Sequence, residues 1–312
     1  MKKLTGIILL LAILLSVLSV SPVFAKTEKE MLDEGHRFMA NKSYGNAIKA
    51  YTETIKQFPN SSEAFLFRGL ALTTVGEIDY AIMDFTRSLT IKPNSGEAYF
   101  SRATCYLLLS QFEKSIEDNK KVVSLEPENY SAYFNMGVAY TKLGQYSEGL
   151  KCLDKAISLH PGEFPLYAEK GSNYFSSDMM DKSAECFKQA SQINPTDNYM
   201  HLMYGLALMR QGKDGAGYFR EYLEKNKDKE WPKPVFRMLS ESITPAECLK
   251  MAVDGEKDKM MQRKCEAYFY IGEYYLIKND KAKAKEYFEK CVATGVNYFN
   301  EYYFSKAELK KL

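Results

Sequence analysis

The stretch from Tyr130 to Glu163, YSAYFNMGVAYTKLGQYSEGLKCLDKAISLHPGE, is the unit that the rest of the chain repeats. Its proline recurs at a constant spacing, and the recurrences make half of the ten prolines: Pro59, Pro93, Pro127, Pro161 and Pro195. A glycine recurs with the same period, with alanine in the one remaining slot: Gly35, Gly69, Ala103, Gly137, Gly171 and Gly205. A fixed period of about 34 residues predicts a stacked array of helical repeats.

Each repeat contains the pattern of two amphipathic helices. In the first repeat, Met31, Gly35 and Phe38 lie on one face of the first helix, and Ala47 and Tyr51 lie on one face of the second. These spacings of three, four and seven place side chains on the same helical side. The proline ends the second helix because it cannot extend the hydrogen-bond ladder. The polar residues that follow each proline can cap the next helix.

This pattern resembles the tetratricopeptide repeat (TPR). Its signature is a large residue, a glycine, a tyrosine, an alanine, a phenylalanine and a proline at these offsets. The likeness covers Glu28 to Asp197 without a gap. It implies an all-α fold, a right-handed TPR superhelix (α-α solenoid) of about seven helical hairpins with a C-terminal capping helix. A repeat scaffold of this kind holds a partner, and the fold alone does not name that partner.

The repeats divide the chain into segments. Residues 1–25 form a secretory signal peptide, 26–226 form repeats 1 to 6, 227–264 form an irregular helical insertion, and 265–312 form repeat 7 plus the capping helix. In the sixth repeat the glycines Gly212, Gly215 and Gly217 crowd the second helix, and the register needs a deletion of one or two residues. Because glycine disfavours helix by about 1 kcal/mol relative to alanine, we expect this helix to be short or distorted.

Two further helices are expected near the C-terminus. Thr244 followed by Pro245 predicts a cap and the first residue of a helix in the insertion. The stretch from Tyr298 to Leu312 is typical of an amphipathic helix. Its basic residues, Lys306, Lys310 and Lys311, suit the solvent-facing cap that a solenoid needs at its end.

The N-terminal stretch predicts export. Lys2 and Lys3 precede an apolar run, and Val23, Phe24 and Ala25 form a small-residue ending that suits cleavage after Ala25. The protein is therefore expected to be exported, periplasmic or secreted, with a retained N-terminal membrane anchor as the alternative. Removal of the two lysines leaves 42 − 2 = 40 basic against 40 acidic residues. This neutral balance argues against nucleic acid as a partner.

Six cysteines in an exported chain raise the question of disulfides. Cys152 and Cys186 occupy equivalent positions on neighbouring repeats, too far apart to pair. Cys265 and Cys291 fall at opposite ends of one hairpin and could meet. Buried free thiols are the other interpretation of this pair.

No pattern in the sequence assembles a catalytic site, a cofactor site or a metal site. The histidines, His36, His160 and His201, lie in separate repeats, and metal-binding and phosphate-binding motifs are absent. Acidic neighbours such as Glu117 and Asp118 are typical of solvated helix faces. We therefore predict that the protein is not an enzyme and needs no cofactor.

In stacked TPR hairpins the fifth and ninth residues of each repeat point into the concave groove. Here these positions form an apolar stripe with a few hydroxyl groups, and we assign it as the partner-binding groove: Leu32, His36, Leu66, Leu70, Phe100, Thr104, Phe134, Val138 and Ser172. An exposed apolar stripe is costly unless it is covered. Either a segment of another protein occupies it, or the superhelix closes on itself, or the terminal helix or a second copy fills it.

A closer resemblance involves the C-terminal part, Trp231 to Leu312. This part resembles the NlpI-like bacterial envelope adaptor family. The likeness lies in a Trp-Pro break, a short helical interlude, the segment from Ala267 to Tyr275 and the segment from Cys291 to Val296. This likeness implies a dimeric adaptor that links envelope proteases with peptidoglycan hydrolases. The chain lacks that family's lipidated cysteine. The alternatives are a cell-wall-active enzyme of the lytic type on a helical solenoid, and a self-assembling structural envelope protein.

Overall fold

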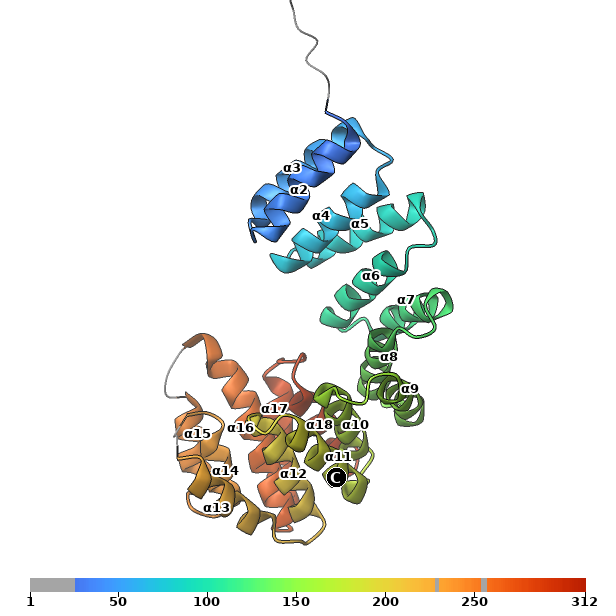
Figure 1. Ribbon diagram of the computed structural model, residues 1–312. Coiled ribbons are helices and arrows are strands. Elements are labelled where there is room, and N and C mark those ends of the chain that lie inside the picture. Colours follow the sequence, from blue (N-terminus) through green and yellow to red (C-terminus); the bar gives the residue numbers. More distant parts are fainter. Residues whose placement is uncertain (1–25, 228–229, 254–256) are drawn as a thin grey trace, which may run out of the picture. The chain divides into compact units, whose positions relative to one another are not determined.

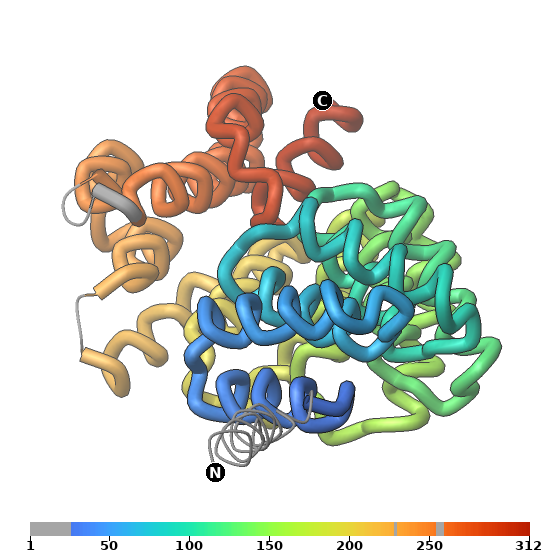
Figure 2. The backbone as a smooth tube through the Cα atoms, turned by 90° about the horizontal axis from the view of Figure 1, so that it is seen from above, coloured from blue at the N-terminus to red at the C-terminus, as the bar shows by residue number. Residues whose placement is uncertain are grey.

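The computed structural model describes residues 26–227, 230–253 and 257–312, and the predicted signal segment 1–25 lies outside them. Seventeen helices, α2 to α18, make up the regular structure of these ranges, and no strand occurs within them. Figure 1 shows the helices as successive pairs along the chain, and Figure 2 shows the backbone from above. The predicted all-α solenoid is confirmed. Among the described helices, none is long and apolar enough to cross a membrane.

The first six repeats each supply one hairpin: α2 (Glu28–Ala40) with α3 (Tyr44–Gln57), α4 (Ser62–Thr74) with α5 (Ile78–Ile91), α6 (Gly96–Leu108) with α7 (Phe112–Leu125), α8 (Tyr130–Lys142) with α9 (Tyr146–Leu159), α10 (Phe164–Ser176) with α11 (Met180–Ile193), and α12 (Asn198–Arg210) with α13 (Gly215–Lys225). The insertion and the C-terminal segment supply the remaining helices: α14 (Lys233–Leu239), α15 (Pro245–Val253), α16 (Lys257–Ile277), α17 (Lys281–Ala293) and α18 (Asn300–Leu309). The chain divides after Pro93 into two compact units, with α2 to α5 in the first and α6 to α18 in the second.

Side-chain caps start the first helices, as the sequence predicts. Ser61, Ser95 and Asn129, at equivalent positions of successive repeats, accept a hydrogen bond from the backbone N–H three residues later. Asp197 does the same at the start of α12. In the insertion, the Thr244 hydroxyl accepts from the N–H of Glu247, whose carboxylate accepts from the N–H of Thr244. Each cap satisfies a backbone donor that has no partner inside its helix.

The repeated glycine packs against the large residue of the second helix. A Cβ added at Gly35 would lie 2.3 Å from the Tyr51 ring, and one at Gly69 would lie 2.7 Å from the Phe85 ring. The equivalent pair in the sixth repeat, Gly205 with Phe219, is two positions closer in the sequence. The helix α13 has 11 residues where α11 has 14. The predicted deletion and the short helix are therefore confirmed.

Two repeats contain an ion pair that the repeat pattern does not predict. Arg68 donates to Asp84, and Arg102 donates to Asp118 at the equivalent position, each with a nitrogen to oxygen distance of 2.7 Å. Asp118 is buried rather than solvated, so the assignment of the acidic neighbours Glu117 and Asp118 to a solvated face is wrong for Asp118. Because burial of an unpaired carboxylate is costly, the arginine side chain folds over it.

The terminal helix α18 does more than cover the end of the array. It packs against α16, α17 and also α10, the first helix of the fifth repeat. Its buried side chains include Glu301, Phe304 and Glu308, whereas Lys306 is exposed as expected. Lys310 and Lys311 are exposed as well, so the predicted solvent-facing lysines of the capping helix are confirmed, and its other face buries two carboxylates and a phenylalanine. The helix is thereby placed against α10, which carries the predicted groove position Ser172.

Candidate functional site

The first unit carries four of the predicted groove residues. Leu32 and Leu66 are buried, with 6% and 7% of their surface exposed, and Leu70 is half-buried. The His36 ring nitrogen Nδ1 lies 2.8 Å from the Tyr51 hydroxyl, and the ring meets the Phe67 ring edge to face with 4.4 Å between their centres. Leu32, Leu66 and His36 therefore take part in the packing of the first unit.

The second unit carries the other five. Phe100, Thr104, Phe134 and Val138 are half-buried, whereas Ser172 is buried and donates to the Ala168 carbonyl at 2.9 Å. Their helices are neighbours, since α6 contacts α8 and α8 contacts α10. Phe134 and Ser172 line one cavity, and Phe100, Thr104 and Val138 are not among its lining residues.

The terminal helix occupies part of the face formed by these first helices. Lys142, at the end of α8, donates a hydrogen bond to Asn300, and its ammonium lies 4.5 Å from the Tyr303 ring centre. The Tyr303 ring meets the edge of Phe112 at 5.8 Å, and its hydroxyl lies 3.5 Å from Ser110. The terminal helix therefore covers the C-terminal ends of α6 and α8 and packs against α10. That it fills the groove stays one of the predicted alternatives.

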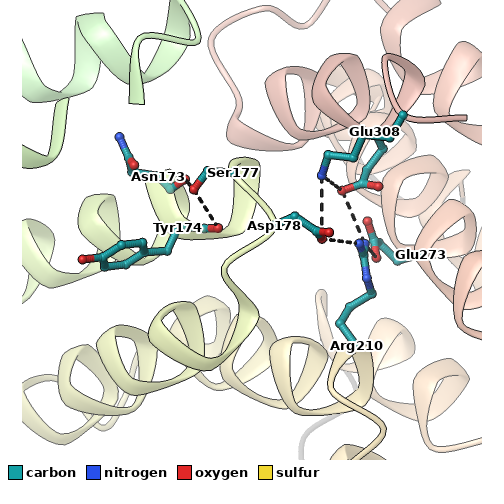
Figure 3. A network of polar contacts seen from close by, with 8 residues as sticks. Asn173, Tyr174, Ser177, Asp178, Arg210, Glu273 and Glu308 are labelled. Carbon is teal, nitrogen blue, oxygen red and sulfur yellow. Dashed lines mark hydrogen bonds and ion pairs between the residues drawn. The ribbon is translucent and has the colours of Figure 1, made fainter. Parts of the chain in front are cut away.

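A buried charge network holds the other end of α18. Arg210 of α12 donates to Glu273 at 2.8 Å and to Asp178 at 3.0 Å, and it lies 3.4 Å from Glu308 of α18 (Figure 3). Lys311 lies 2.8 Å from Glu308. Burial raises the pKa of Glu273 to about 7, although the Arg210 charge lowers it. The pKa of Arg210 is raised because, against the effect of burial, the carboxylates of Glu273 and Glu308 favour its charged form.

Between α18 and the first helices lies a cavity of about 450 Å³. This volume is in the usual range of ligand pockets, about 300 to 1,000 Å³. Its apolar side chains come from the first helices of four hairpins (α8, α10, α12 and α16), from the second helix α11, and from α18 with the segment before it. They are Phe134, Phe164, Pro165, Ala168, Phe187, Met200, Met203, Tyr270, Tyr298, Phe299 and Phe304. Apolar walls around a few polar groups are typical of a site that binds a specific partner.

Three glutamates supply the acidic groups of this cavity: Glu169, Glu266 and Glu301. They are 7%, 4% and 7% exposed. The Glu266 carboxylate accepts hydrogen bonds from Tyr199 at 2.9 Å and from the Trp231 indole, and Glu301 accepts from Tyr270 at 3.2 Å. We call this cavity the three-glutamate pocket.

Burial raises the pKa of all three carboxyl groups. The pKa of Glu266 is raised to about 8 by burial and by the nearby charge of Glu301. The pKa of Glu169 is raised by burial, against the opposing charge of Lys142. The pKa of Lys142 is in turn lowered by burial, although the charges of Glu169 and Glu301 favour its protonated form. Desolvation of the charged form is the common cause.

The sequence interpretation missed these glutamates. Glu169 directly follows Ala168, the fifth residue of its repeat. An acidic residue beside a groove position was therefore the one feature of the sequence that could have indicated Glu169 as a site residue. Glu266 and Glu301 lie outside the six-repeat array, and only the packing of α16 and α18 brings them to the pocket. The described residues contain no group of three or more metal-ligating side chains with suitable placement.

The histidines that the sequence leaves without chemistry have packing partners. The His160 ring lies 4.1 Å from the Tyr130 ring. His201 Nε2 lies 3.0 Å from the Pro195 carbonyl oxygen. Cys265 and Cys291 are free thiols with their sulfur atoms 3.4 Å apart, so the two ends of the hairpin do meet.

No curated protein matches this chain in sequence. Solved structures share its fold at low identity. The type IV pilus biogenesis factor PilW has a TM-score of 0.59 and 18% identity, and the match covers 67% of this chain and 97% of that one. MamA from Desulfovibrio magneticus RS-1 has a TM-score of 0.53 and 22% identity, with 56% and 99% covered. YrrB, described as a TPR protein with an unusual peptide-binding site, has a TM-score of 0.52 and 15% identity, with 63% and 100% covered.

Family models of the tetratricopeptide repeat match residues 32–95, 96–129, 130–163, 164–197 and 266–293. They cover the first five repeats almost completely and the seventh hairpin. These matches, the helix pairs and the glycine-to-aromatic contacts agree with one another. The chain belongs to the tetratricopeptide repeat family.

Proposed function

We propose that this protein is a non-catalytic scaffold that binds a partner polypeptide on the first-helix face of its second unit, at the three-glutamate pocket. Stacked helical repeats provide extended surfaces for protein–protein interaction. The observation that carries the proposal is the cavity of about 450 Å³ between Phe134 and α18, which has predominantly aromatic and aliphatic walls. A side chain or short segment of a partner would bury apolar surface there.

The cell envelope is the proposed place of action. The signal-like segment 1–25 and the resemblance of Trp231 to Leu312 to the NlpI-like adaptor family support it. In this proposal the protein brings envelope proteases together with peptidoglycan hydrolases. The other predicted groove positions of the second unit, Phe100, Thr104 and Val138, would extend the contact. A second copy of the chain would compete for the same face.

A photo-crosslinking amino acid at Phe134 tests the binding face directly. In cells that export the protein, we expect adducts with defined envelope polypeptides from this position. The same amino acid at Lys155, an exposed residue of the second helix α9, is the control and should not give these adducts. Identical adducts at both positions would contradict the proposal.

A double substitution then tests the contribution of the groove residues. The variant with Phe100→Glu and Phe134→Glu should keep its helical circular dichroism and lose binding of the crosslinked segment, because both side chains are half-buried on the first-helix face. Isothermal titration calorimetry with the purified segment measures the loss. Unchanged affinity in a folded double variant would count against this face.

A rival function as a cell-wall-active enzyme would place its acid at Glu266, whose raised pKa and cavity suit proton donation. We expect no clearing when the purified protein is run in a gel that contains peptidoglycan. Clearing by the wild type and not by Glu266→Gln would replace the scaffold proposal with the enzymatic one.

A further inference from the structure

The three-glutamate pocket has hydrogen-bonding capacity that the described residues do not use. The Oε1 atom of Glu169 is buried and has no hydrogen-bond partner among them. The Glu169 side chain lines the pocket together with Glu266 and Glu301. A buried carboxylate oxygen without a donor costs free energy, so a bound group that donates hydrogen bonds would be stabilised there.

The charged residues that line the pocket are all acidic: Glu169, Glu266 and Glu301. Among the described residues, Lys142 at the end of α8 and Arg263 on α16 are cations that act on them from outside the lining. Tyr199, Trp231 and Tyr270 are neutral donors to two of the carboxylates. The described lining residues of this cavity thus include three carboxyl groups and no lysine or arginine, and a cationic ligand would complement these groups once they ionise.

The walls restrict the shape of such a ligand. Phe134, Phe164, Met200 and Phe304 surround the carboxyl groups with apolar surface. A lysine or arginine side chain has an aliphatic stem that can contact such walls and a charged end that can reach a carboxylate. A compact inorganic cation would leave most of the apolar surface unfilled.

We propose that the three-glutamate pocket binds the cationic end of a lysine or arginine side chain that a partner polypeptide inserts between α10 and α18. This inference rests on the proposed scaffold function for the polypeptide, but the pocket's preference for a cation can be tested by itself. The bound ammonium or guanidinium would donate to Glu169 Oε1 and face Glu266 and Glu301. The stem would contact Phe134 and Met200.

The first test uses n-butylammonium as a probe and n-butanol as its neutral counterpart, on the full-length mature chain. Methyl signals of Met200 and Met203, which line the pocket, report binding by NMR, and the exposed Met83 is the internal control. We expect n-butylammonium to shift the two pocket signals with roughly tenfold higher affinity than n-butanol, the size of effect typical of hydrogen bonds to a charged group. Equal affinities would overturn the inference.

Substitution of Glu169 identifies the carboxylate. Glu169→Gln should weaken n-butylammonium roughly tenfold and leave n-butanol unchanged, because the amide keeps the shape and removes the charge. Glu185→Gln, at an exposed position on α11, is the matched control and should bind both probes as the wild type does. Unchanged n-butylammonium affinity in Glu169→Gln would overturn the assignment.

The pH dependence gives a second readout. Since burial raises the pKa of Glu266 to about 8 and raises that of Glu169 and Glu301, a cation binds best once these groups ionise. The affinity for n-butylammonium should therefore rise between pH 6 and pH 9, whereas that for n-butanol should not. An affinity for n-butylammonium that falls over this range would contradict the inference.

The polypeptide part is tested with the segment crosslinked at Phe134. Replacement of its basic side chain by norleucine should weaken binding roughly tenfold. A segment without lysine or arginine, or one that binds equally after replacement, would overturn the inference and leave the scaffold function intact. Probe binding to the pocket without any crosslinked polypeptide would instead count against the scaffold function.

Discussion

Arg210 of α12 donates a hydrogen bond of 2.8 Å to Glu273 of α16, across 63 positions of the sequence. The Glu273 side chain is fully buried, and the same guanidinium reaches Asp178 and Glu308. One arginine thus joins the sixth repeat, the seventh hairpin, the terminal helix and the turn between α10 and α11. The junction joins the C-terminal end of α18 to the turn that follows α10.

Truncation of Arg210 should therefore destabilise the second unit. Arg210→Ala leaves Glu273 and Glu308 buried without this cation, and loss of one partner of a buried pair costs about 3–5 kcal/mol. Urea denaturation followed by circular dichroism measures the change in the free energy of unfolding. Arg220→Ala is the control, because Arg220 is 55% exposed and lies 3.8 Å from Asp214, and it should change stability by less than about 1 kcal/mol. Equal effects of the two substitutions would contradict the role of Arg210.

Glu266 makes the stability of the fold depend on pH. Its folded-state pKa of about 8 lies above an unfolded value of about 4.3, so between these values the unfolded chain binds fewer protons at this site. The contribution of Glu266 to the free energy of unfolding is therefore fully present below about pH 4.3 and is lost as pH rises toward about 8.

Glu266→Gln should remove this dependence. We expect the variant to gain stability over the wild type as pH rises from 5 to 8, by on the order of a few kcal/mol at the upper end. Urea denaturation at pH 5, 6.5 and 8 measures the difference. Glu286→Gln, at an exposed position of α17, should show no such trend. A constant difference between Glu266→Gln and the wild type would show that this carboxyl group ionises normally.

Two glycines of the first repeat should respond oppositely to alanine. At Gly35 the added Cβ would lie 2.3 Å from the Tyr51 ring, whereas at Gly45 nothing lies within 4 Å. Overpacking at Gly35→Ala should cost about 1–3 kcal/mol, and Gly45→Ala should stabilise α3 by up to about 1 kcal/mol. Thermal melting of both variants checks the difference. A stabilised Gly35→Ala variant would mean that the hairpin is packed less closely than the structure shows.

All six cysteines are free thiols, including Cys265 and Cys291, whose sulfur atoms lie 3.4 Å apart. Thiol titration of the denatured, unreduced protein should therefore count six thiols in the wild type. Cys265→Ser should lower the count to five, because it removes one thiol and releases none. A disulfide between the two would reverse this order. The wild type would then count four thiols, and Cys265→Ser would count five.

Repetition explains why so much of the helical array could be predicted. Each hairpin uses the same local contacts, such as Gly69 with Phe85, and the same caps, such as Ser61 and Ser95. Because these interactions join residues close in the chain, a pattern in one repeat predicts them in the next. Even the shortened register of the sixth repeat was predictable from its glycines.

The candidate site was predictable only in part. Phe134 and Ser172 follow from the phase of the repeat, and both line the three-glutamate pocket. The sequence does not reveal that Leu32 and Leu66 are buried or that Asp118 folds under Arg102. Those outcomes depend on which neighbouring side chain covers each position.

The amino-acid sequence by itself determined the repeat, the hairpins and the caps, because their contacts are local and recur with the repeat period. Tertiary structure alone decided where the terminal helix lies and which acidic groups it buries. The contact of Lys142 with Asn300 spans 158 positions, and that of Tyr199 with Glu266 spans 67. Such contacts form once, outside the repeat period, and so depend on how the last helices pack back onto the array.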